Sequence, residues 1–109
     1  MNNFTPWLDA LGARNRGRRE FFGTVFGKLE RLNFTLQNPN AIEGGYRLEF
    51  HKGDKYVVAD RYCSFPVMGE TPGIALYDDA EDWDCTFSAL APLSMVLKSL
   101  EYLAEDENE

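Results

Sequence analysis

The stretch that decides the fold is YRLEFHKGDKYVVADRY, residues 46–62. In its first part Tyr46, Leu48 and Phe50 alternate with polar residues, which is the two-residue period of a strand with one buried face. The turn residues Lys52-Gly53-Asp54 follow, and after them comes a second run rich in Tyr and Val. The stretch therefore predicts a β-hairpin.

Other strand-like runs lie on both sides of this hairpin. A short strand is expected at 34–37, and two more at 73–77 and 83–88, joined by the acidic segment 78–82. Because strands do not alternate with helices along the chain, we expect the sheet to be antiparallel.

Helical signals occupy the two ends of the chain. Thr5 followed by Pro6 predicts a short helix at about residues 6–11, with Thr5 as its cap. Apolar residues at i, i+3, i+4 and i+7 predict a helix at 18–32 and another that opens at Pro92 and runs to about Ala104. The stripes are Phe22, Val25, Phe26, Leu29 and Leu32, and Leu93, Val96, Leu97, Leu100 and Leu103.

These elements predict one small domain over residues 1–109, of the α+β class. We expect an antiparallel sheet of about four to five strands, with the N-terminal helices and the C-terminal helix on one face, and a loose acidic tail at 104–109. A hydrophobic content of 44% and fifteen aromatic residues favour a folded core over disorder.

Charge is divided unevenly along the chain. Residues 1–61 carry ten basic and seven acidic side chains, whereas residues 62–109 carry eleven acidic side chains and one base, Lys98. The net charge is −7. A surface of one sign attracts cationic partners and repels nucleic acid and anionic membranes, so we expect a partner protein with a basic surface.

The candidate partner-binding residues are the acids of the 78–84 loop and of the last helix. They are Asp78, Asp79, Glu81, Asp82, Asp84, Glu101 and Glu105. The alternative is that these acids only aid solubility. Cations are slightly unfavourable at a helix start, so the basic cluster Arg14–Arg19 does not serve to stabilise the helix. It is interpreted as a solvated linker, and an anion contact or an intramolecular patch is the alternative.

The same loop is the best metal candidate, but its acids do not follow the alternating pattern, with a central Gly, of a calcium loop. We therefore expect no metal and no cofactor. Cys63 and Cys85 are too far apart for a zinc knuckle, and their aromatic neighbours favour buried, reduced thiols.

Catalysis would have to be built around His51, which is the only histidine. No nucleophile elbow or phosphate-binding glycine loop is present. We therefore expect a protein that is not an enzyme, and a small enzyme or ligand-binding domain using His51 and Cys63 is the alternative.

Tyr46, Tyr56 and Tyr62 would suit a sheet that stacks nucleic-acid bases, but a sequence pI near 4.6 opposes phosphate binding, so we expect these rings in the core. The chain has neither a run of about 20 apolar residues nor the basic and apolar lead of a secretory signal. The cytoplasm is the expected compartment, without contact to membranes.

The leading hypothesis is a non-enzymatic acidic protein that binds and inhibits or escorts another protein. Immunity proteins and phage or plasmid inhibitors of host enzymes are similar in size and charge, and carboxylates that imitate nucleic-acid phosphates are one mode of such inhibition. A dimer similar to secretion chaperones, which would bind an effector segment, is a further alternative, so a homodimer stays open. No motif matches one of these groups specifically.

Overall fold

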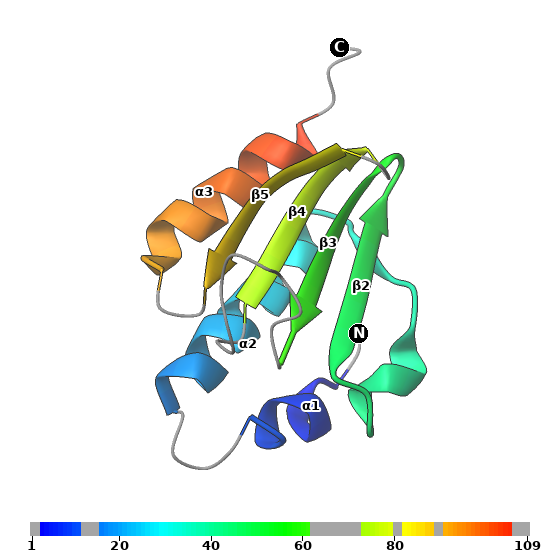
Figure 1. Ribbon diagram of the computed structural model, residues 1–109, viewed down its shortest axis with the longest axis vertical. Coiled ribbons are helices and arrows are strands. Elements are labelled where there is room, and N and C mark those ends of the chain that lie inside the picture. Colours follow the sequence, from blue (N-terminus) through cyan, green and yellow to red (C-terminus); the bar gives the residue numbers. More distant parts are fainter. Residues whose placement is uncertain (1–2, 12–15, 62–72, 80–81, 89–90, 106–109) are drawn as a thin grey trace.

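The computed structural model describes residues 3–11, 16–61, 73–79, 82–88 and 91–105 (Figure 1). Along these residues, two α-helices come before a five-stranded sheet and a third α-helix follows it. The elements are α1 Thr5–Asp9, α2 Arg16–Arg31, β1 Thr35–Leu36, the 3-10 helix η1 Pro39–Ile42, β2 Arg47–Lys52, β3 Lys55–Asp60, β4 Gly73–Asp79, β5 Asp82–Ser88 and α3 Leu93–Ala104.

The sheet is an antiparallel meander with the strand order β1-β2-β3-β4-β5. The predicted hairpin is confirmed as β2 and β3, in which Leu48 lies opposite Ala59 and Phe50 opposite Val57. Gly53 occupies the hairpin turn with a φ of +61°, a conformation that L side chains rarely adopt. The α+β class and the antiparallel sheet are therefore confirmed.

Helices α2 and α3 lie side by side behind the sheet (Figure 1). Their predicted apolar stripes are confirmed, since Phe22, Val25 and Phe26 of α2 and Val96 and Leu100 of α3 are fully buried. The α2 helix begins at Arg16, two residues before the expected start, so Arg16 and Gly17 are helical and not linker, and Arg14 lies outside the described residues.

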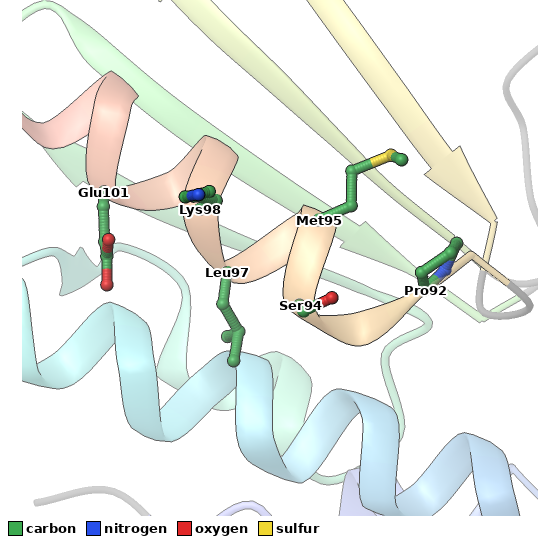
Figure 2. A pocket seen from close by; sticks show the side chains of 6 residues that line it. All are labelled: Pro92, Ser94, Met95, Leu97, Lys98 and Glu101. Atoms are coloured by element: carbon green, nitrogen blue, oxygen red, sulfur yellow. The ribbon is translucent and has the colours of Figure 1, made fainter.

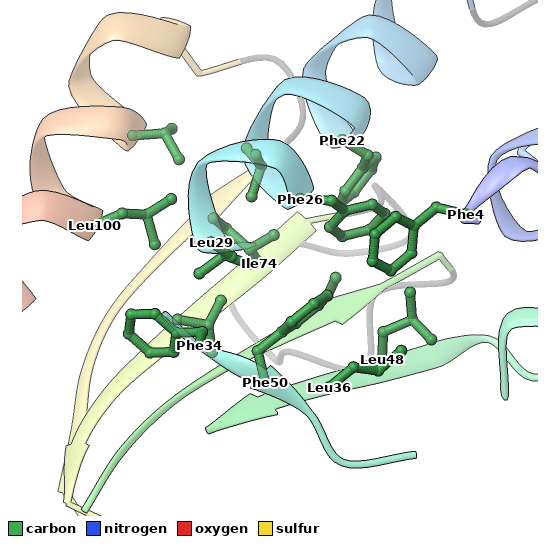
Figure 3. Close-up of a cluster of buried hydrophobic side chains, with 14 of the residues drawn as sticks. Phe4, Phe22, Phe26, Leu29, Phe34, Leu36, Leu48, Phe50, Ile74 and Leu100 are labelled. Atoms are coloured by element: carbon green, nitrogen blue, oxygen red, sulfur yellow. The ribbon is translucent and has the colours of Figure 1, made fainter. Parts of the chain in front are cut away.

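A group of aromatic rings fills the centre of the core (Figure 3). The ring of Phe26 lies 4.6 Å from Phe4, 5.4 Å from Phe50 and 5.9 Å from Phe22, measured between centroids. These rings come from the N-terminal segment, α2 and β2, so the core joins elements far apart in the sequence.

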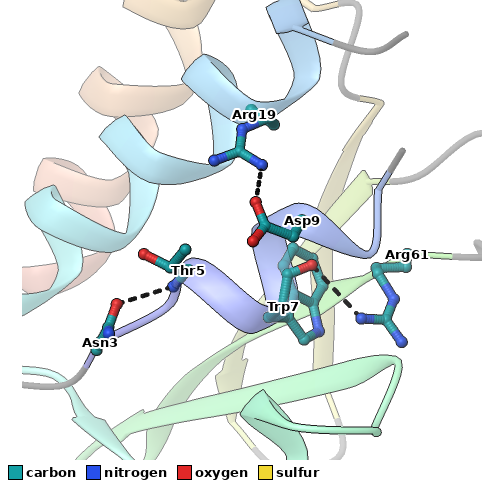
Figure 4. A network of polar contacts seen from close by, with 6 residues as sticks. All are labelled: Asn3, Thr5, Trp7, Asp9, Arg19 and Arg61. Atoms are coloured by element: carbon teal, nitrogen blue, oxygen red, sulfur yellow. Dashed lines mark hydrogen bonds and ion pairs between the residues drawn. The ribbon is translucent and has the colours of Figure 1, made fainter. Parts of the chain in front are cut away.

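The short helix α1 is held to the sheet by Trp7, which is fully buried. The guanidinium of Arg61, at the end of β3, lies 5.5 Å from the centre of the Trp7 ring and donates to the Trp7 carbonyl oxygen at 3.4 Å (Figure 4). The expected Thr5 cap is wrong, because Thr5 is already helical and Phe4 is the N-cap. The Thr5 amide has no acceptor within the helix and donates to Asn3 Oδ1.

Candidate functional site: the acidic end of the sheet

Acidic residues from three separate segments meet at one end of the sheet. The β2–β3 turn, the end of β4 with the start of β5, and the C-terminus of α3 all lie at the top of Figure 1. Antiparallel pairing of β3 with β4 places the start of β3 beside the end of β4 on this side. We call the set Asp54, Asp78, Asp79, Asp82 and Glu105 the acidic end.

Two lysines of the hairpin tie this end together. The Lys52 ammonium donates to the Ala104 carbonyl oxygen at 3.3 Å, and the Lys55 ammonium donates to the Glu105 carbonyl oxygen at 2.8 Å. Lys55 also lies 4.0 Å from an Asp78 carboxylate oxygen. Because the last carbonyls of a helix carry partial negative charge, these cations stabilise the C-terminus of α3. The Asp78 carboxylate and the backbone carbonyl of Glu105 are thereby brought to the same lysine.

The acids predicted to bind a partner differ in how they are placed. Asp78 is well exposed, with 58% of its side chain accessible. Asp79 and Asp82 are backbone partners where β4 meets β5, and Asp84 lies two residues further along β5. Glu81 lies outside the described residues.

Glu101 is separate from the acidic end. It extends from α3 toward α2 (Figure 2), where its carboxylate pairs with the Lys28 ammonium. The hydrogen bond from Lys28 and its charge hold the pKa of Glu101 below the ordinary value of 4.5, with a smaller effect from Lys98. Its charge is therefore largely compensated within the chain.

The first turns of α2 carry arginines at the opposite end of the molecule (Figure 1). Arg19 pairs there with Asp9 of α1 (Figure 4), while Arg18 lies one residue before it. The longest dimension of the molecule is 43 Å, several times the screening length of about 8 Å at physiological ionic strength. The two ends therefore act as separate charged surfaces, and the charge division of the sequence becomes a division in space.

The face of the sheet away from the helices carries a row of stacked rings. His51, Tyr56 and Tyr77 are neighbours across β2, β3 and β4, with centroids 5.0 Å apart in the first pair and 4.5 Å in the second. The planes of Tyr56 and Tyr77 are 4° apart, so these rings use their faces on one another instead of offering them to nucleic-acid bases.

This row also corrects the expected position of the tyrosines. Tyr56 packs on a small outer cluster of Val58 and Ala75, and Tyr46 is 50% exposed, so neither is in the main core. Tyr62 lies outside the described residues. Sequence alternation alone does not show which of two ring-bearing faces meets the helices.

Of the two candidate catalytic residues, His51 and Cys63, the structure describes His51. The His51 ring is stacked on Tyr56, and its buried Nε2 atom has no hydrogen-bond partner among them. No group of three His, Cys, Asp or Glu side chains in this part of the chain would hold a metal ion. Cys63 lies outside the described residues, and Cys85 is a backbone partner of Leu76 in β5.

Three residues at this end of the sheet were absent from the sequence prediction: Asp54 of the acidic end, and Lys52 and Lys55, which bind the C-terminus of α3. They belong to the hairpin turn, and their role depends on which strand ends lie beside α3, which no local signal shows.

The described helices include none with the length and apolar character needed to cross a membrane.

No protein-family model matches the chain, and comparisons with curated proteins and with solved structures found no match.

Proposed function

We propose that this chain is a non-enzymatic protein that binds another protein through its acidic end. The observation that carries the proposal is the meeting of acids from three segments at one end of the molecule, with the arginines of α2 at the other. A uniformly acidic surface would attract a basic partner in any orientation, whereas this uneven distribution turns the acidic end toward the partner.

The partner expected for such a surface is a protein with a basic patch. Carboxylates at an interface rim chiefly raise the association rate and select against wrong partners. Asp78 is free to serve this role because more than half of its side chain is exposed, and its contact with Lys55 is long at 4.0 Å. Binding by this surface would inhibit or escort the partner by covering its basic site, and a nucleic-acid-binding site is one such target.

The surroundings of His51 support binding over catalysis. A general base needs an accessible nitrogen near a substrate, but the His51 ring lies against Tyr56 and its Nε2 atom is buried. We propose that the protein acts in the cytoplasm.

Charge reversal at the acidic end tests the proposal. Partners would be captured from host lysate with the wild type, with Asp78→Lys/Glu105→Lys and with Glu20→Lys/Glu43→Lys, at about 50 mM and about 500 mM salt. The control pair makes the same change in net charge at two exposed acids away from the acidic end.

At low salt, the wild type and the control variant should capture a specific basic partner, and at high salt both should capture it only weakly. The acidic-end variant should not capture it at either salt concentration. Equal capture by all three proteins, or capture that ignores salt, would refute the proposed surface.

A further inference from the structure

The two edges of the sheet are built differently. Beside β2, the strand β1 is only two residues long, and beyond it the Asn38 side chain takes the place of a strand. Asn38 Nδ2 donates to the Arg47 carbonyl oxygen and Asn38 Oδ1 accepts from the Glu49 amide, both at 2.9 Å. The Gln37 amide donates to the Glu49 carbonyl oxygen at 2.8 Å. These backbone groups of β2 are satisfied within the chain, which protects this edge from pairing with another strand.

The opposite edge is β5, which is seven residues long and pairs with β4 on one side. In the described part of the chain no strand lies on its other side. Its pairing with β4 is regular from Cys85 to Ser88 and shifts in register toward Asp82. Alternate residues of an edge strand direct both their amide and their carbonyl outward, so the regular part of β5 is suited to receive a further strand.

The helix layer extends beyond this edge. In Figure 1 the strands end at β5, whereas α3 lies behind β5 and extends past it. Leu97 and Glu101 point toward α2, and Met95 lies about 160° around the helix axis from Leu97 because each residue turns the helix by about 100°. Figure 2 accordingly shows Met95 pointing away from α2 and toward β5. Tyr102 follows two turns later on the same side of α3.

Met95 and Tyr102 are exposed at 54% and 76%, although the helix that carries them packs on the core. They lie about 10 Å apart along the helix. Side chains at i, i+2 and i+4 on one face of a strand span about 13 Å. A strand added beside β5 would therefore cover both residues with its inner face, in the way that β4 packs against α3.

We propose that the outer edge of β5 binds an extended segment of the partner protein, which adds to the sheet in front of the exposed side of α3. Main-chain hydrogen bonds to β5 supply affinity, and alternate side chains in contact with Met95 and Tyr102 supply specificity. This inference rests on the proposed function, because it names the part of the partner that is bound.

Charge specifies the segment. β5 carries Asp82 and Asp84 and starts at the acidic end. α3 runs antiparallel to β5, so Tyr102 lies toward the acidic end and Met95 toward Ser88 (Figure 1). We therefore expect Lys or Arg at the end of the segment beside Asp82, and apolar side chains at alternate positions along the rest. A second copy is a poorer occupant, because it would bring another net charge of −7 to the same edge.

Selection from a random peptide library displayed on phage tests the segment, with peptides of about ten residues to match the upper length of an ordinary strand. The immobilised wild type should enrich peptides with alternating apolar residues and Lys or Arg at one end. Prior depletion on Met95→Ala/Tyr102→Ala removes peptides that bind other surfaces. No enrichment, or enriched peptides without this pattern, would overturn the proposal.

Fluorescence anisotropy with the enriched peptide measures the contribution of α3. Met95→Ala/Tyr102→Ala should weaken binding about tenfold or more, since exposed aromatic side chains that become buried dominate such interfaces. Tyr46→Ala is the matched control, because it removes another exposed tyrosine that lies outside α3 and β5, and it should leave the affinity unchanged. Equal affinities for all three proteins would exclude the α3 contact.

Methylation of peptide amides tests the strand pairing. Methyl groups on one alternate set of amides, those that face β5, should abolish binding, whereas methyl groups on the other set should leave it nearly intact. Hydrogen exchange should slow in β5 when the peptide is added. Equal effects of the two methylated peptides would exclude an added strand. A dimer in sedimentation equilibrium with β5 already protected would assign the edge to a second copy and overturn the proposal.

Failure of this proposal is distinguishable from failure of the proposed function. If capture from lysate is lost in Asp78→Lys/Glu105→Lys but unchanged in Met95→Ala/Tyr102→Ala, the acidic end binds the partner without the β5 edge. If only the double alanine variant loses capture, the edge binds a partner that the acidic end does not select, and the proposed function is wrong.

Discussion

Replacement of Phe26 by alanine should destabilise the fold by about 4 kcal/mol. Phe26 is fully buried, and its ring lies between 4.6 and 5.9 Å from those of Phe4, Trp7, Phe22 and Phe50. Truncation of a buried Phe costs roughly 3–5 kcal/mol, as the sum of lost hydrophobic transfer and a cavity. Because these rings come from α1 with its N-cap, α2 and β2, collapse into the cavity is limited and the loss should exceed 3 kcal/mol.

Urea unfolding followed by far-UV circular dichroism measures this change. For a slope of about 1.3 kcal/mol per M, 4 kcal/mol lowers the midpoint by about 3 M. Phe26→Leu keeps most of the volume and should cost about 1.5 kcal/mol, and the exposed Thr24→Ala should change stability by less than about 0.5 kcal/mol. If Phe26→Ala cost no more than Phe26→Leu at an unchanged slope, the aromatic centre of the core would be wrongly placed.

Three other substitutions test polar contacts. Lys55→Met removes the donor to the Glu105 carbonyl oxygen, so it should accelerate hydrogen exchange in the last turn of α3; unchanged exchange would refute that contact. The Lys28 pair lowers the pKa of Glu101 below 4.5, so its stabilisation is present above that pH and is lost as pH falls through the lowered pKa. The difference in unfolding free energy between wild type and Lys28→Met should therefore be largest near neutrality and vanish in acid, and a difference independent of pH would contradict it. His51→Phe keeps the stacked ring and removes a buried nitrogen with no hydrogen-bond partner among the described residues, so urea unfolding should show a gain of about 0.5–1 kcal/mol. A loss of stability would argue for a polar contact to His51.

Polar contacts hold α3 in place in addition to the core. Lys52 and Lys55 act on α3 through its terminal carbonyls, whereas Glu101 acts on α2 through Lys28. The C-terminal helix is therefore held at its end by the hairpin and along its side by α2.

Local patterns in the sequence determined the secondary structure. The alternation at residues 46–62 and the stripe containing Phe22 and Phe26 predicted the hairpin and the core helix, because periods of two and of 3.6 residues follow from backbone geometry alone. The acids of the 78–84 segment and of the last helix were also visible as a charge excess. The predicted first helix cap was wrong, because the helix begins at Thr5 itself and Phe4, one position earlier, is the N-cap.

Only the tertiary structure decided which of these features lie together. Asp54 is an ordinary turn residue until the strand order places its hairpin beside the β4–β5 end, and Glu101 belongs to the acidic excess until α2 presents Lys28 to it. Tyr56 is aromatic like the residues at the centre of the core, but it packs on the face of the sheet away from the helices. Contacts of this kind join residues far apart in the chain, and their free energy depends on packing in three dimensions, which no local sequence pattern contains.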